Sequence, residues 1–149
     1  FLTLPLMVGT IALQGQGYAV SRLERAPFLK AKRILYWGDL DAHGFEILAI
    51  LRRAFPQVES LMMDAQTWAR FPNYRGVGVA SRNPPEQFLP FLDEQEVSLF
   101  AQISDADQRL EQEHIPQDYV NERLAQKMAV MGIQVGTLKG SSLLGEVTF

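Results

Sequence analysis

The chain has 149 residues, of which 47% are hydrophobic, and this is enough for one domain with a buried core. It contains no cysteine, which excludes disulfides and thiolate metal sites and is typical of a cytoplasmic protein. No segment has the length and apolarity of a membrane span or the basic start of a signal peptide. Because the chain begins at Phe1 without a methionine, we expect it to be a fragment of a longer protein.

The net charge of −3 argues against a protein that binds nucleic acid over its whole surface. The charges are uneven, however. Residues 1–82 carry ten Lys or Arg against six acidic residues, whereas residues 83–149 carry four against eleven. This asymmetry permits a phosphate-rich partner on the first part of the chain, although solvated helix faces account for most such charges.

The first elements predicted along the chain are short. Residues 10–13 form an apolar run that predicts a strand, and residues 18–29 have the apolar spacing of a short helix interrupted by a proline. Gly15 and Gly17 follow this strand and would let backbone amides approach a phosphate, or would simply form a tight turn. Arg22 is a further candidate for phosphate binding, with a solvated surface position as its alternative.

The strongest pattern begins at residues 34–37, an apolar run that predicts a buried strand. An amphipathic run over residues 45–55 predicts a helix, which a proline then ends. Residues 58–63 predict a second buried strand, and residues 65–71 predict a second helix. The alternation of strand and helix across residues 10–71 predicts an α/β fold with a parallel sheet and right-handed crossovers.

Two aspartates directly follow the strand at residues 34–37. Asp39 and Asp41 stand one residue apart, so both carboxylates can reach one side of the chain. Ligands bind beyond the carboxyl ends of strands in such sheets, and two neighbouring carboxylates repel each other there unless a cation lies between them or water separates them. Mg²⁺ suits this arrangement because it needs few protein ligands and retains waters. The alternative is that Asp41 caps the following helix.

Three nearby residues are further candidates. His43 would ligate a metal, bind a phosphate or act as a general acid, or it would only satisfy a local backbone group. Gly44 is expected to allow close approach of the chain or a left-handed turn, and it need not touch a ligand. Asp64 ends the second strand and is a candidate third acid for metal binding, with capping of the helix after it as the alternative.

A loop rich in Pro, Gly, Asn and Ser at residues 72–85 separates two parts. We expect an α/β part over residues 1–82, a helical extension of the same domain over residues 83–131, and an unassigned tail over residues 132–149. The helices expected in the extension cover residues 88–103, 109–115 and 119–131. Glu111 and His114 would share a helix face, in a surface ion pair or a partner contact.

The segments ILYWGDLDAHGFEIL, VESLMMDAQTW and RLEQEHIP together resemble a known family. They are similar to the carboxy-terminal, Toprim-type domain of JetD, the nuclease subunit of bacterial Wadjet anti-plasmid systems, which is related to the DNA-cleaving subunit of topoisomerase VI. The likeness covers roughly residues 1–120 and is most specific in WGDLDAHG, with independent support from RLEQE at residues 109–113.

The resemblance implies a Toprim-like parallel sheet in which a glutamate on the first strand and an Asp-x-Asp on a later strand together bind Mg²⁺, or Mn²⁺ in its place. Asp39 and Asp41 match the aspartates, and Asp64 is expected to serve as a further ligand or to orient a water. The glutamate would lie just ahead of FLTLP at residues 1–5, so the first strand and one ligand are expected to be missing here.

The same resemblance implies a DNA endonuclease that cuts plasmid DNA hydrolytically together with an SMC-type complex, and Toprim relatives often form homodimers. We expect the isolated chain to be inactive. A phosphatase of the haloacid dehalogenase type is one alternative, although His43 stands where that motif has Thr or Val, and Lys127 and Lys139 lie in poor contexts for its lysine. A non-catalytic interaction module with a merely structural aspartate pair is another.

Overall fold

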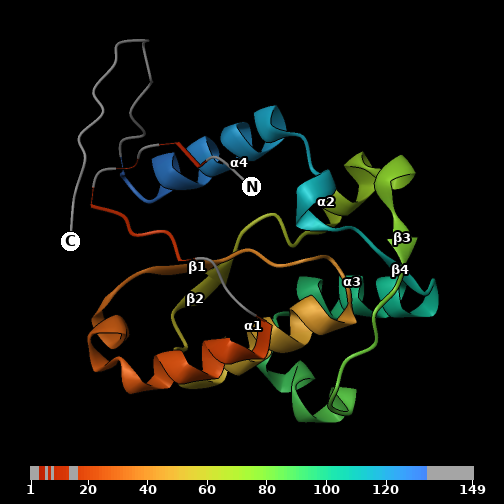
Figure 1. Cartoon of the computed structure of the whole chain (residues 1–149), viewed down its shortest axis with the longest axis horizontal. Coiled ribbons are helices and arrows are strands. Elements are labelled where there is room, and N and C mark those ends of the chain that lie inside the picture. The colour runs from red at the N-terminus through yellow and green to blue at the C-terminus, as the bar shows by residue number, and fades with distance from the viewer. Residues whose placement is uncertain (1–3, 6, 8, 14–16, 134–149) are drawn as a thin grey trace.

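The computed structural model describes residues 4, 5, 7, 9–13 and 17–133, and its centre is a small parallel sheet (Figure 1). Strand β1 (Ile34–Tyr36) pairs in parallel with β2 (Val58–Ser60), with Ile34 opposite Val58. Helix α1 (Ala42–Ala54) connects the two strands. In Figure 1 the sheet lies between α1 on one side and α4 (Gln117–Val130) on the other. The predicted α/β fold is therefore confirmed.

Helix α1 forms where the apolar spacing predicted it. Phe45 and Leu48 are fully buried on its inner face, and the Asp41 carboxylate caps its first turn. The helix ends before Pro56, which has no N–H to continue the hydrogen-bond pattern. The buried face of α1 packs against β2, α3 and the 3₁₀ helix at Gly17–Arg25, so this helix carries the centre of the core.

The remaining elements are short. The other helices and strands are α2 (Ala65–Arg70), β3 (Gly76–Val77), α3 (Glu94–Asp105) and β4 (Gln108–Arg109). Further 3₁₀ turns lie at Pro27–Ala31, Pro72–Tyr74, Pro85–Gln87, Leu89–Phe91 and Gln112–His114. The predicted helices at residues 18–29, 65–71 and 119–131 are thus confirmed in place, although the first consists of 3₁₀ turns. None of the helices in the described ranges is long and apolar enough to cross a bilayer.

The strand predicted at residues 10–13 is wrong. These residues form no strand, and Ile11 and Leu13 are 81% and 67% exposed. A short apolar run favours a strand only if another layer covers it, and no such cover reaches these two side chains. The parallel sheet therefore has β1 and β2 as its strands in the part of the chain that the structure describes.

The helix predicted at residues 109–115 is also wrong. Strand β4 pairs antiparallel with β3, and Leu110 then forms an isolated bridge with Leu40. The Leu40 N–H donates to the Leu110 carbonyl at 2.9 Å, and the Leu110 N–H donates back at 3.1 Å. Leu110 is fully buried, and tertiary pairing has overridden its helical spacing. The region 72–85, predicted as a loop, accordingly includes β3.

An internal ion pair joins the two parts of the chain. Arg52 on α1 donates from both terminal nitrogens to Glu96 on α3, and its Nε donates to the Val58 carbonyl at 2.9 Å. Glu96 also accepts from the Ser60 hydroxyl at 2.7 Å. Burial alone would raise the pKa of Glu96, but the hydrogen bonds from Arg52 and Ser60 hold that pKa below its usual value. One continuous core therefore spans both parts.

Removing one partner of this pair is expected to be costly. Glu96→Ala leaves the Arg52 guanidinium buried without its carboxylate and should lower the free energy of unfolding by about 3 kcal/mol. Urea denaturation followed by circular dichroism measures this loss. Gln95→Ala, an exposed change on the same helix, is the matched control and should stay within about 0.5 kcal/mol of the wild type. Equal effects of the two changes would contradict a structural role for the pair.

Candidate functional site

The two predicted aspartates lie on a short connection after β1, residues 37–41, which we call the aspartate loop. Asp41 is 2% exposed, and its Oδ1 accepts a hydrogen bond from the Gly44 N–H at 2.7 Å. The capping role given as the alternative for Asp41 is therefore present. Capping by one oxygen does not exclude cation binding by the same carboxylate, because an ionised carboxylate has acceptor capacity on both oxygens.

Gly44 explains how the aspartate loop packs on α1. A Cβ built at Gly44 would overlap the backbone carbonyl oxygen of Asp39. Any other residue would push the loop away from the first turn of the helix, so the expected close approach of the chain at Gly44 is confirmed. Its neighbour His43 lies in the same turn and is half-buried.

Asp39 is held by a segment far away in the sequence. Its Oδ1 accepts from the backbone N–H of Gln112 at 2.9 Å, and the Gln112 side-chain amide donates to the Trp37 carbonyl at 2.6 Å. Together with the Leu40–Leu110 bridge, these bonds mean that Leu110 and Gln112 contact the aspartate loop at Trp37, Asp39 and Leu40. The sequence pattern RLEQE marked this segment but did not predict these contacts.

Negative charge is concentrated around Asp39. Burial raises the pKa of Asp39 above its usual value, and the Gln112 amide opposes this shift only in part. The carboxylates of Asp41, Glu113 and Glu111 raise it further. The ionised form of Asp39 is therefore disfavoured in the folded chain, and a nearby cation would relieve this unfavourable electrostatics.

Asp41 is also buried, but more neighbouring groups oppose the rise in its pKa. Burial raises the pKa of Asp41, while the Gly44 amide, the His43 side chain and the Arg109 guanidinium lower it without cancelling the increase. Arg109 also forms an ion pair with Glu111, and Glu111 lies 3.6 Å from His114 Nε2. The expected Glu111–His114 proximity is thus present, on a 3₁₀ turn instead of an α-helix.

Asp64 is engaged elsewhere. Its Oδ1 accepts from the Thr67 N–H at 2.8 Å and so caps α2, and its carboxylate forms an ion pair with Arg123 on α4 at 2.5 Å. Burial would raise the pKa of Asp64, but hydrogen bonds from Arg123 and Thr67 lower it overall. Across the described residues, no group of three or more His, Asp or Glu side chains is arranged to hold a metal ion. Asp39 and Asp41 form a pair, and Asp64 does not join them.

Two of the residues predicted to contact a phosphate, Gly17 and Arg22, lie on one 3₁₀ helix. Gly15 lies outside the described residues. Gly17 begins the first 3₁₀ helix with φ of +57°, a left-handed conformation that explains a glycine there, and Arg22 is exposed on the same helix. That helix packs against α1.

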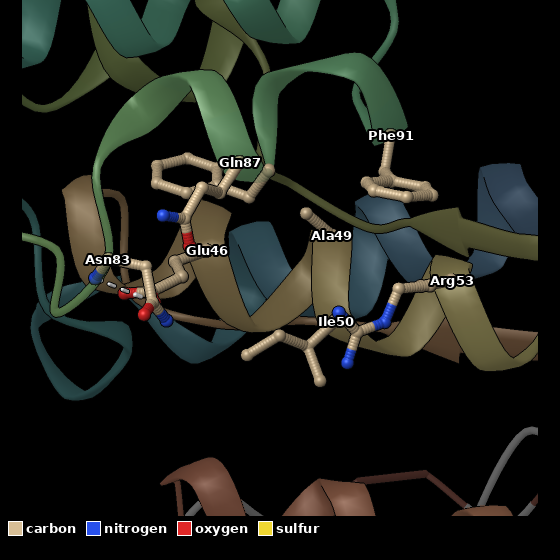
Figure 2. A pocket seen from close by; sticks show the side chains of 8 residues that line it. Glu46, Ala49, Ile50, Arg53, Asn83, Gln87 and Phe91 are labelled. Carbon is tan, nitrogen blue, oxygen red and sulfur yellow. Dashed lines mark hydrogen bonds between the residues drawn. The ribbon is translucent and has the colours of Figure 1, made fainter.

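Glu46, a residue that the sequence analysis did not single out, is fully buried on α1. It accepts from the backbone N–H groups of Arg82 at 2.7 Å and Asn83 at 3.1 Å, which ties the loop after β3 to α1. Figure 2 shows Glu46 and Asn83 at one end of a hollow of about 360 Å³ between α1 and residues 83–91. Its lining contains neither Asp39 nor Asp41, so this hollow is separate from the aspartate loop. In the sequence, Glu46 stands among the apolar residues of the predicted helix, and this position was the signal that could have identified it as buried.

The fold and site define an α/β domain with an acidic loop at the carboxyl end of its parallel sheet. The family model of the C-terminal part of the Wadjet protein JetD matches residues 1–124. The chain therefore belongs to this family and represents a component of the Wadjet anti-plasmid system, which confirms the resemblance seen in the sequence. Membership implies association with other Wadjet subunits. A comparison with curated proteins finds no match.

The phosphatase alternative needs a lysine at the site, and the structure does not support Lys127 in this role. Lys127 forms an ion pair with Glu59 of β2 at 2.6 Å and so stabilises the contact between α4 and the sheet. Lys139 lies outside the described residues.

The charge crowding at Asp39 predicts that Asp39→Asn stabilises the metal-free chain at neutral pH. Asparagine keeps an acceptor for the Gln112 N–H and removes the disfavoured charge. Because the pKa of Asp39 is raised, this gain should be complete above that pKa and should shrink as pH falls through it toward the ordinary value of 3.8. Urea midpoints measured from pH 7 to pH 3 test the trend, and a destabilised variant at pH 7 would contradict it.

Asp64→Asn is the matched control with the opposite sign. It retains the cap but loses the ion pair with Arg123, so it should lower stability at pH 7 by about 1 kcal/mol or less. Because the pKa of Asp64 is lowered, the stabilisation in the wild type is present above the ordinary value and disappears as pH falls through the lowered one. The same urea series measures it, and a gain in stability would overturn the assignment.

Proposed function

We propose that this chain carries the metal-binding aspartates of a Mg²⁺-dependent DNA endonuclease with a Toprim-type fold. The observation that carries the proposal is the pair Asp39 and Asp41 at the carboxyl end of β1, both with raised pKa values and with Glu111 and Glu113 adding negative charge. Membership in the Wadjet JetD family supports the same function. A fold that disfavours its own buried charges is typical of a binding site for a cation.

Asp39 and Asp41 fit a hard divalent cation, because both offer carboxylate oxygens and, among the described residues, no arginine forms a bidentate ion pair with either. Mg²⁺, or Mn²⁺ in its place, would neutralise phosphate oxygens and activate a water for hydrolysis. On this proposal Asp39 and Asp41 hold the cation, while His43 beside them binds the phosphate or transfers a proton. Asp64 instead contributes to stability through Arg123.

Two carboxylates make an incomplete site, and a further acidic ligand from outside the described residues would complete it. We therefore propose that the 149-residue chain cleaves DNA weakly or not at all, and that the intact protein has the activity. Plasmid DNA is the proposed substrate and an SMC-type complex the proposed partner, with a homodimer as a possible assembly. Exposed Arg22, Arg25 and Lys30 supply basic surface for phosphates, with Gly17 as the proposed point of close backbone approach, whereas Gly44 packs against the Asp39 carbonyl.

The test is a plasmid-cleavage assay with the intact protein, its partners and Mg²⁺ or Mn²⁺. Asp39→Ala should abolish cleavage, with a loss of at least about 100-fold, because it removes a metal ligand. Asp118→Asn changes an exposed aspartate on α4 and should leave the rate unchanged.

Full activity of the Asp39→Ala protein would overturn the proposal. Robust nicking by the isolated chain that Asp39→Ala abolishes would contradict only the proposal that this chain is inactive by itself, since it would make the two aspartates sufficient. Aluminium fluoride trapped at Asp39 would favour the phosphatase instead.

A further inference from the structure

Gln112 contacts the aspartate loop on both sides of Gly38. Its side-chain amide donates to the Trp37 carbonyl at 2.6 Å, and its backbone N–H donates to Asp39 Oδ1 at 2.9 Å. One residue therefore fixes both the backbone before Asp39 and the carboxylate of Asp39 itself. The separation of 73 residues between Asp39 and Gln112 means that tertiary structure alone brings them together.

We propose that Gln112 is a positioning residue of the metal centre, which orients Asp39 so that Oδ2 is the oxygen presented to the cation. The inference rests on the proposed function, because it assigns how that same site is assembled. Within the described part of the chain, the hydrogen bond at the Asp39 carboxylate engages Oδ1. Oδ2 is thus left as the ligand atom. The hydrogen bond from the Gln112 backbone N–H to Oδ1 opposes rotation of the Asp39 carboxylate.

The chemistry of this residue suits the role. The donor to Asp39 is the backbone N–H of Gln112, which carries no charge and does not compete with a divalent cation, while the Gln112 side chain donates to the Trp37 carbonyl. Gln112 is a neutral donor flanked by Glu111 and Glu113, which both raise the pKa of Asp39. The contact therefore fixes Asp39 without reducing the negative charge that attracts the cation.

The neighbouring acids, Glu111 and Glu113, do not take over the contact that Gln112 makes with the aspartate loop. Glu111 is engaged by Arg109 and lies near His114, and Glu113 is exposed. Leu110 is fully buried and forms the bridge to Leu40 that sets the register of the segment. Within residues 109–113, Arg109 and Glu111 form an ion pair, Leu110 pairs with Leu40, and Gln112 contacts Trp37 and Asp39.

Gln112→Met tests the proposal, since methionine has similar length and packing but cannot donate to the Trp37 carbonyl, the bond that holds the Gln112 backbone N–H in place against Asp39 Oδ1. The matched control is Gln57→Met, because Gln57 also donates from its amide to backbone carbonyls, those of Leu29 and Lys30. Mn²⁺ affinity of the intact protein is measured by calorimetry for the wild type, both glutamine variants and Asp39→Asn. Urea denaturation of each variant gives the stability in parallel.

We expect Gln112→Met to weaken Mn²⁺ binding by about 10-fold or more and Gln57→Met to leave it within about twofold, at similar losses of stability. If Asp39→Asn removes binding but Gln112→Met does not weaken it, the positioning role falls and the proposed metal site stands. If the wild type binds no Mn²⁺, or Asp39→Asn binds normally, both fall. Equal weakening by both glutamine variants would also overturn the positioning role, because it would reflect stability alone.

Discussion

The two-way backbone bridge between Leu40 and Leu110 is the contact on which the rest of the site depends. Leu40 stands between the two aspartates, so whatever fixes Leu40 also fixes the directions in which Asp39 and Asp41 leave the backbone. Both leucines are almost completely buried, and an unpaired N–H or carbonyl there would be strongly unfavourable. The bridge thus satisfies the backbone of the aspartate loop and aligns Gln112 with Asp39.

Four of the buried and half-buried acids fall into two groups by the direction of their pKa shift. Glu96 and Asp64 are each paired with an arginine, and their pKa values are lowered, so both contribute to stability when ionised. Asp39 and Asp41 have raised pKa values, although Arg109 lies close enough to moderate the second. Electrostatic stabilisation is therefore present where the elements pack against one another and weak at the largely buried aspartate loop. Functional sites commonly show this pattern, because the ligand supplies the missing charge.

Much of the fold was predictable from the sequence because its signals are local. The apolar run before Gly38, the spacing over α1 and Pro56 together specify β1, α1 and the start of β2. The motif WGDLDAHG likewise indicated both the position of the acids and the need for Gly44. These features depend on neighbours within a few residues, where periodicity and capping rules apply.

The errors have a common cause in long-range contacts. Leu110 has helical spacing, yet it pairs with Leu40 across the chain, and Ile11 has strand character without a layer to cover it. Asp64 looked equivalent to Asp39 because both follow a strand, but only the fold shows that Arg123 engages it. No rule of local spacing contains the information that Gln112 contacts Asp39 or that Arg52 contacts Glu96.

The span between Leu40 and Leu110 also has a consequence for the order of events during synthesis. Strands β1 and β2 and helix α1 involve contacts over short stretches and can form early, whereas the aspartate loop obtains its partners only after residue 112 has been made. Closing so long a stretch of chain also costs more conformational entropy than forming a local helix. The acidic loop therefore obtains its partners after the chain of β1, α1 and β2 has been made.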